Sequence, residues 1–96
     1  MEGTKVETKG INIIEEALKK HNGEDAIISI FHKLYGGEQK IKAKLDYIFD
    51  ESRIGFRIKD GQEKFIYRSE LINYGTEDGI YFADNLMEIR IKLHRQ

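Results

Sequence analysis

Near the start of the chain, hydrophobic side chains recur at helical spacing. Ile11, Ile14 and Leu18 occupy positions i, i+3 and i+7, which places them on one face of a helix. Gly23 then offers the left-handed conformation in which helices commonly end. We therefore expect a helix over about residues 12–21.

Residues 25–35 fit two interpretations. One helical face could be formed by Ile27, Ile28, Phe31, Leu34 and Tyr35. The stretch 27–31 is rich in β-branched and aromatic residues, which suit a strand buried on both sides. A continuous apolar run does not separate helix from strand by periodicity. Composition therefore decides, and we favour the strand.

From residue 40 onward, polar and apolar residues alternate, as in strands with one buried face. The first run places on its inward face Ile41, Ala43, Leu45, Tyr47 and Phe49, and on its outward face Lys40, Lys42, Lys44 and Asp46. The second run has inward Ile54, Phe56 and Ile58, and outward Arg53, Arg57 and Lys59. We expect one long strand over 40–49 and a neighbouring strand over 53–59.

Asp60-Gly61 separates two alternating runs and predicts a tight hairpin, because type I′ turns need positive φ at both central positions. A two-residue turn would join strands 53–59 and 62–68. It would create two inward cross-strand pairs, Phe56 with Phe65 and Ile54 with Tyr67. On this register both aromatic side chains of the second strand belong to the core, so we expect them to pack there rather than to stack on bases.

Further strands are expected over residues 71–74, 80–83 and 87–93. The predicted fold class is mainly β, with an N-terminal helix followed by a five- or six-stranded antiparallel small barrel or strongly bent sheet of SH3 or Sm-like kind. The polar residues 1–9 are expected to form a flexible leader, and residues 10–96 a single helix-plus-barrel domain.

Composition limits the functional classes. The 96 residues carry a formal net charge of −1, so any electrostatic function must use a local patch. The absence of cysteine excludes disulfides, thiolate metal sites and a cysteine nucleophile. No apolar stretch is long enough to cross a membrane, and the polar start does not resemble a signal peptide. We expect a cytoplasmic protein with no membrane partner.

No constellation of residues predicts catalysis. The three histidines, His21, His32 and His94, lack metal-ligand spacing. No glycine-rich loop precedes a helix to hold phosphate, and the carboxylate pairs Asp50-Glu51 and Glu77-Asp78 both lie in expected turns. We therefore expect a non-enzymatic protein with no catalytic residues, no metal and no cofactor.

Basic residues gather on the outward faces of the two strands that are expected to be neighbours. Like charges placed side by side in a sheet cost stability, so one interpretation is that a nearly neutral protein collects them for a function. On that interpretation the function is phosphate binding, and we expect an RNA or DNA backbone interface formed by Lys40, Lys42, Lys44, Arg57, Lys59, Lys64 and Arg68. The alternative interpretation is a solvated face whose lysines prevent pairing between sheet edges.

The closing strand predicts self-association. Residues 87–93 are apolar at alternate positions, and the chain contains no proline, so this strand would form an edge that another copy can extend. We expect a homodimer or a larger ring. The alternative function is therefore a protein-interaction or assembly domain that pairs through an exposed strand and has no role in nucleic-acid binding.

Several segments follow one another in a characteristic order: a short helix, ISIF at 28–31, a glycine turn, a strand containing Leu45-Asp46, and FIYR at 65–68. This order, over about residues 14–72, resembles the Sm-like barrel, the bacterial Hfq type in particular. The resemblance implies a ring assembled through the fourth and fifth strands, and RNA binding. The family's Tyr-Lys-His segment corresponds here to Tyr67-Arg68-Ser69, so serine replaces the histidine. Lysines stand where a glycine is expected in the second strand.

Overall fold

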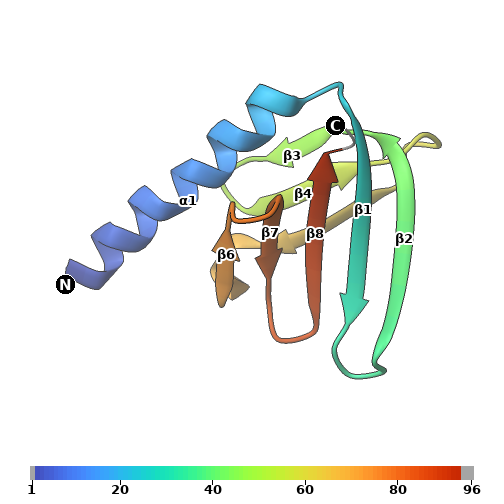
Figure 1. Cartoon of the computed structure of the whole chain (residues 1–96). Coiled ribbons are helices and arrows are strands. Elements are labelled where there is room, and N and C mark those ends of the chain that lie inside the picture. The colour runs from blue at the N-terminus through green and yellow to red at the C-terminus, as the bar shows by residue number, and fades with distance from the viewer. Residues whose placement is uncertain (1, 94–96) are drawn as a thin grey trace.

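The computed structural model describes residues 2–93, and these contain one α-helix, eight strands and a short 3₁₀ helix (Figure 1). In chain order the elements are α1 (Glu2–His21), β1 (Asp25–His32), β2 (Gly37–Lys44), β3 (Tyr47–Phe49), β4 (Arg53–Arg57), β5 (Glu63–Tyr67), the 3₁₀ helix η1 (Arg68–Glu70), β6 (Asn73–Gly75), β7 (Ile80–Ala83) and β8 (Met87–Leu93). The strands form a large antiparallel sheet, in the order β2-β1-β8-β7-β6, and a small one, β3-β4-β5. The fold is mainly β with an N-terminal helix and a strongly bent sheet, as the alternation predicted.

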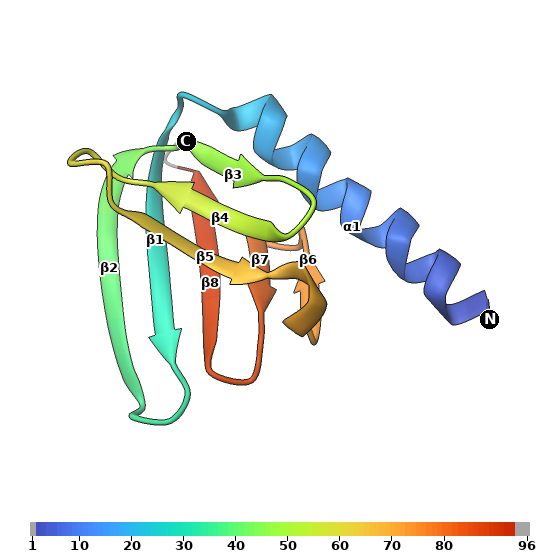
Figure 2. The ribbon, with the colours of Figure 1, turned by 180° about the vertical axis from the view of Figure 1, so that it is seen from behind.

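The two sheets pack face to face with their strands crossing. The large sheet lies nearer the viewer in Figure 1, and the small sheet in Figure 2. Their facing sides form one core whose fully buried side chains include Ile28, Ile30, Ile54, Phe56, Ile66, Phe82, Ile89 and Ile91. Helix α1 lies across one end of the two layers (Figure 1) and adds Ile11, Ile14 and Leu18 to the same core. Burial of this apolar surface is the main force that joins the layers.

The predicted apolar face of the helix is confirmed, but its predicted start near residue 12 is wrong. Helix α1 begins at Glu2, so residues assigned to a leader are helical. The periodic signal begins only at Ile11, and a helix anchored by packing can extend because each further residue adds a backbone hydrogen bond. In the described part of the chain, no helix has the length and apolarity needed to span a membrane.

The choice of strand over helix for residues 25–35 is confirmed by β1. Ala26, Ile28 and Ile30 are buried in the core, and they alternate with Ile27 and Ser29, which are only half-buried. The strand is therefore buried on one face rather than on both. Its second face forms the outer surface of the large sheet.

The expected long strand over 40–49 is two strands in two different sheets. Leu45 still continues the pairing of β2 with the segment before β1, since its amide donates to the carbonyl oxygen of Glu24 at 2.9 Å and its own carbonyl oxygen accepts from the amide of Gly23 at 2.7 Å. Asp46 already lies beside β4, because its carbonyl oxygen accepts from the amide of Arg57 at 2.8 Å, and the chain continues as β3 in the small sheet. This break at residues 45–46 bends the sheet over itself and encloses the core.

The hairpin at Asp60-Gly61 is confirmed, but its predicted register is wrong by one residue. Gly61 has φ +87°, and its amide donates to the carbonyl oxygen of Ile58 at 2.8 Å. Ile58 pairs with Gln62 through a 2.9 Å hydrogen bond, so the loop has three residues and ends in a left-handed glycine. The resulting pairs include Ile54 with Ile66, Gly55 with Phe65 and Phe56 with Lys64.

The register moves two aromatic side chains out of the core, contrary to the prediction. Phe65 lies on the outer face of the small sheet, opposite Gly55, and Tyr67 follows on the same face with 54% of its surface exposed. The two rings meet edge to face at 5.2 Å. The guanidinium of Arg53 lies over the ring of Phe65, 5.1 Å from its centroid.

Candidate binding cleft

The two basic strands are not neighbours, so the predicted continuous basic face is wrong. Strand β2 forms an edge of the large sheet, whereas β4 is the central strand of the small sheet. The separation follows from the break after β2, which sends the next segment into the second layer. Lys40, Lys42 and Lys44 are exposed and alternate with Ile41 and Ala43, as the sequence predicted.

The layers diverge beside β2, and a cleft opens there. The turn of the β4–β5 hairpin lies beside the C-terminal end of β2 in both views (Figures 1 and 2). The cleft has a volume of about 890 Å³. Its lining consists of apolar Ala26, Ile27, Ile41, Ala43 and Ile58, basic Lys42, Lys44, Arg57 and Lys59, and acidic Asp25, Asp46 and Asp60. Four of the predicted nucleic-acid-binding residues thus meet around one cavity despite belonging to two sheets.

Ion pairs neutralise half of these four cations. The ammonium of Lys44 lies 3.0 Å from a carboxylate oxygen of Asp25. The guanidinium of Arg57 lies 3.3 Å from Asp46 and 3.4 Å from Glu63. Among the described side chains, no carboxylate lies within ion-pair distance of Lys42 or Lys59.

The other three predicted residues lie outside the cleft lining. Lys40 stands two residues before Lys42 on the same exposed face of β2. Lys64 pairs with Phe56 and therefore shares the inward side of β5, where it is half-buried. Arg68 begins η1 and lines a different cavity.

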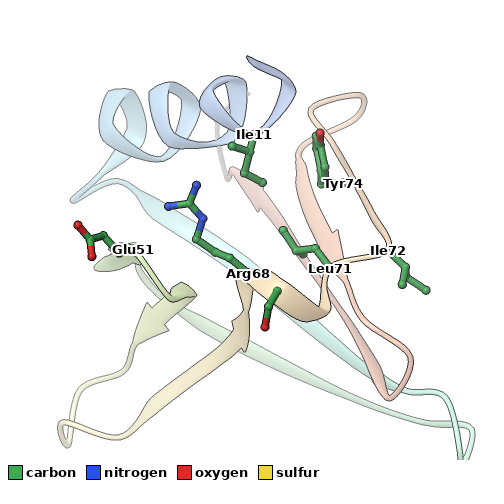
Figure 3. Close-up of a pocket in the computed structure, with 7 residues that line it drawn as sticks. Ile11, Glu51, Arg68, Leu71, Ile72 and Tyr74 are labelled. Atoms are coloured by element: carbon green, nitrogen blue, oxygen red, sulfur yellow. The ribbon is translucent and has the colours of Figure 1, made fainter. Parts of the chain in front are cut away.

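This second cavity, of about 550 Å³, lies beneath α1 (Figure 3). Ile11, Leu71 and Tyr74 point into it, while Ile72 points away. The guanidinium of Arg68 lies 4.9 Å from the centroid of the Phe49 ring and donates from Nη1 to the carbonyl oxygen of Asp50 at 2.9 Å. Arg68 therefore holds the turn after β3 against η1, a structural role that accounts for its charge.

A carboxylate organises that same turn. Asp50 accepts hydrogen bonds from the amides of Ser52 at 3.0 Å and Arg53 at 2.7 Å, and from Nε and Nη2 of Arg53 at 3.0 and 2.9 Å. The amide of Ser52, followed by the side chain of Arg53, lowers the pKa of Asp50 below its ordinary value of 3.8. The hydrogen bond to Asp50 likewise raises the pKa of Arg53.

The lowered pKa of Asp50 predicts an acid-sensitive turn. A carboxyl group whose pKa is depressed by folding contributes stability above its unfolded pKa and loses that contribution as the pH falls through its folded pKa. The carboxyl carbon NMR shift of Asp50, followed against pH, should therefore show a titration midpoint below 3.8. In Asp50→Asn, the stability lost below pH 4 should be smaller than in the parent. A normal midpoint for Asp50, with an unchanged acid profile in the variant, would contradict the assignment.

The structure also places the sheet edges. Strand β8 lies between β1 and β7, so the predicted edge at residues 87–93 is wrong, because its alternating apolar residues are paired on both sides. The large sheet ends instead at β2 and β6. Strand β2 has eight residues, whereas β6 has three and lies against α1.

The apolar floor of the cleft could not be recognised from sequence. Ala26, Ala43 and Ile58 come from three separate segments, and each carries only the ordinary signal of an inward strand position.

Within the described residues, no group of three His, Asp or Glu side chains is placed to hold a metal ion. The cleft thus brings together cations, carboxylates, apolar surface and the edge strand β2.

Comparison of the chain with models of known protein families, with curated proteins and with solved structures finds no significant match.

Proposed function

We propose that the protein is a non-enzymatic interaction module that binds an extended polypeptide segment along the free edge of β2. The observation that carries the proposal is the combination of an eight-residue edge strand with a cleft of about 890 Å³ beside it. A strand that adds to an edge gains main-chain hydrogen bonds, and pockets beside that edge select alternate side chains. Both components are found at β2.

Strand β2 suits this role better than β6, the other edge of the large sheet. In an antiparallel edge strand, every second residue directs its N–H and C=O groups away from the sheet. Proline would remove such a donor, and β2 contains none. The other edge of the large sheet, β6, is too short to guide a partner, and α1 packs against it.

RNA or DNA binding, the function suggested by the lysines and by the Sm-like resemblance, has less support. Near the cleft, the described cations without a carboxylate partner are Lys40, Lys42 and Lys59. Three phosphate contacts would give a slope of log K against log salt of only about −2.7, and a correspondingly weak interaction at physiological salt. Arg57, Arg68 and Lys44 already have protein partners.

Peptide selection tests the proposal without assuming a sequence. We expect a library of random ten-residue peptides, displayed on phage and selected on the full-length protein, to yield binders. Bound peptides should slow hydrogen exchange at alternate amides of residues 37–44, because only those amides point toward an added strand. RNA and DNA oligonucleotides are measured in parallel by filter binding at several salt concentrations. Selected peptides that protect other segments, or oligonucleotides that bind where no peptide does, would overturn the proposal.

A further inference from the structure

We infer that the segment bound by β2 is acidic, with carboxylates at alternate positions and small or apolar residues between them. This inference rests on the proposed function. It adds the chemical class of the partner.

The outer face of β2 carries a row of positive charges. Lys40, Lys42 and Lys44 occupy alternate positions, so their side chains stand in one row on the same side of the strand. Side chains of an added antiparallel strand would lie directly opposite this row, with Cβ atoms about 4.5–5.5 Å away. Carboxylates at alternate positions of the partner would meet all three ammonium groups.

The neighbouring strand β1 neutralises only one lysine of this row. Across β1, Lys40 stands opposite Ser29 and Lys42 opposite Ile27, so neither faces a carboxylate. Only Lys44 stands opposite an acid, Asp25, with which it pairs. The next strand, β8, continues the register with Arg90 opposite Ser29 and Lys92 opposite Ile27. The unmet charge therefore faces the open edge.

The opposite face of the added strand would meet different residues. Ile41 and Ala43 point from β2 toward the cleft, where Ile58, the residue before the hairpin loop, also lies. An added strand would direct its intervening side chains toward these three apolar residues. A carboxylate placed directly against them would be disfavoured, because burial of a carboxylate without a partner is costly. The positions beside Ile41 and Ala43 therefore favour apolar side chains, which makes the segment alternate.

Three peptides test the inference. Each has eight residues with blocked ends and alternates valine with glutamate, threonine or lysine. With the full-length protein, we expect the glutamate peptide to bind about tenfold more tightly than the threonine peptide and the lysine peptide to bind least, as opposite-charge cross-strand pairs with Lys40 and Lys42, the two lysines of the row without a carboxylate partner, imply. Amide NMR shifts should change within residues 37–44. Lys40→Glu/Lys42→Glu should reverse the order of the peptides, whereas Lys40→Arg/Lys42→Arg, which keeps the charge, should preserve it.

The outcomes separate the inference from the proposed function. If the three peptides bind β2 equally well, the acidic partner is wrong but strand addition stands. If none binds, or if the shifts map elsewhere, strand addition itself is wrong. Sedimentation that shows a dimer of the parent protein, with the β2 amides protected from exchange, would show that a second copy occupies this edge and would overturn the inference. Circular dichroism of each variant confirms that it is folded.

Discussion

Gly55→Ala should lower the free energy of unfolding by about 3 kcal/mol or more, at the upper end of the cost of overpacking. A Cβ atom at this position would overlap the carbonyl oxygen of Lys64 and would lie 2.6 Å from the Cα atom of Phe65. These are backbone atoms of the paired strand β5, so no side-chain rotation can relieve the contact. Strands β4 and β5 would have to separate at the centre of the small sheet.

Urea unfolding followed by circular dichroism measures this loss. Gly37→Ala is the matched control, because the same methyl group added at the start of β2 meets no atom within 4 Å. That variant should be neutral or slightly more stable, since alanine has less conformational freedom to lose on folding. Equal stability of the two variants would show that β4 and β5 do not approach as closely as the register requires.

The register around Gly55 also shows where sequence reasoning reached its limit. Asp60-Gly61 fits a two-residue and a three-residue loop equally well, because both need a residue with positive φ. Packing decides between the two loop lengths. Gly55 pairs with Phe65 on one side and with Ile48 of β3 on the other, and the absence of a side chain at Gly55 leaves room for both neighbours on the outer face. A one-residue change in register reverses the face of every side chain that follows. The outward positions of Phe65 and Tyr67 were therefore not predictable from alternation alone.

For the candidate site, the individual side chains were predictable but their assembly was not. Alternation correctly placed Lys40, Lys42 and Lys44 on the exposed face of a strand. It gave no sign of the break at Leu45, because the inward pattern continues through Tyr47 in sequence. That break is set by contacts distant in the sequence, since Leu45 is still bonded to residues 23–24 beside β1, whereas the carbonyl oxygen of Asp46 accepts from the amide of Arg57 in the small sheet. The cleft exists only because of this bend.

Phe56→Ala should also destabilise the protein strongly, by about 3–5 kcal/mol, the usual cost of truncating a buried phenylalanine. Its side chain is fully buried and belongs to the core between the two sheets. For a domain of this length, whose total stability is roughly 5–15 kcal/mol, such a loss would remove a large share. Ile13→Ala is the control, because Ile13 is 53% exposed on α1 and its truncation should change stability by less than about 0.5 kcal/mol.

Phe56→Ala should also weaken peptide binding at the cleft. Phe56 anchors the end of β4, and the next residues, Arg57 to Asp60, form the cleft wall opposite β2. At a temperature where Phe56→Ala is still folded, amide exchange in β4 and β5 should accelerate far more than in β1 and β8. The glutamate–valine peptide should then bind less tightly, because the mobile hairpin no longer holds Ile58 and Lys59 beside the edge. Unchanged affinity together with accelerated exchange would show that β2 alone binds the peptide and that the hairpin wall contributes nothing.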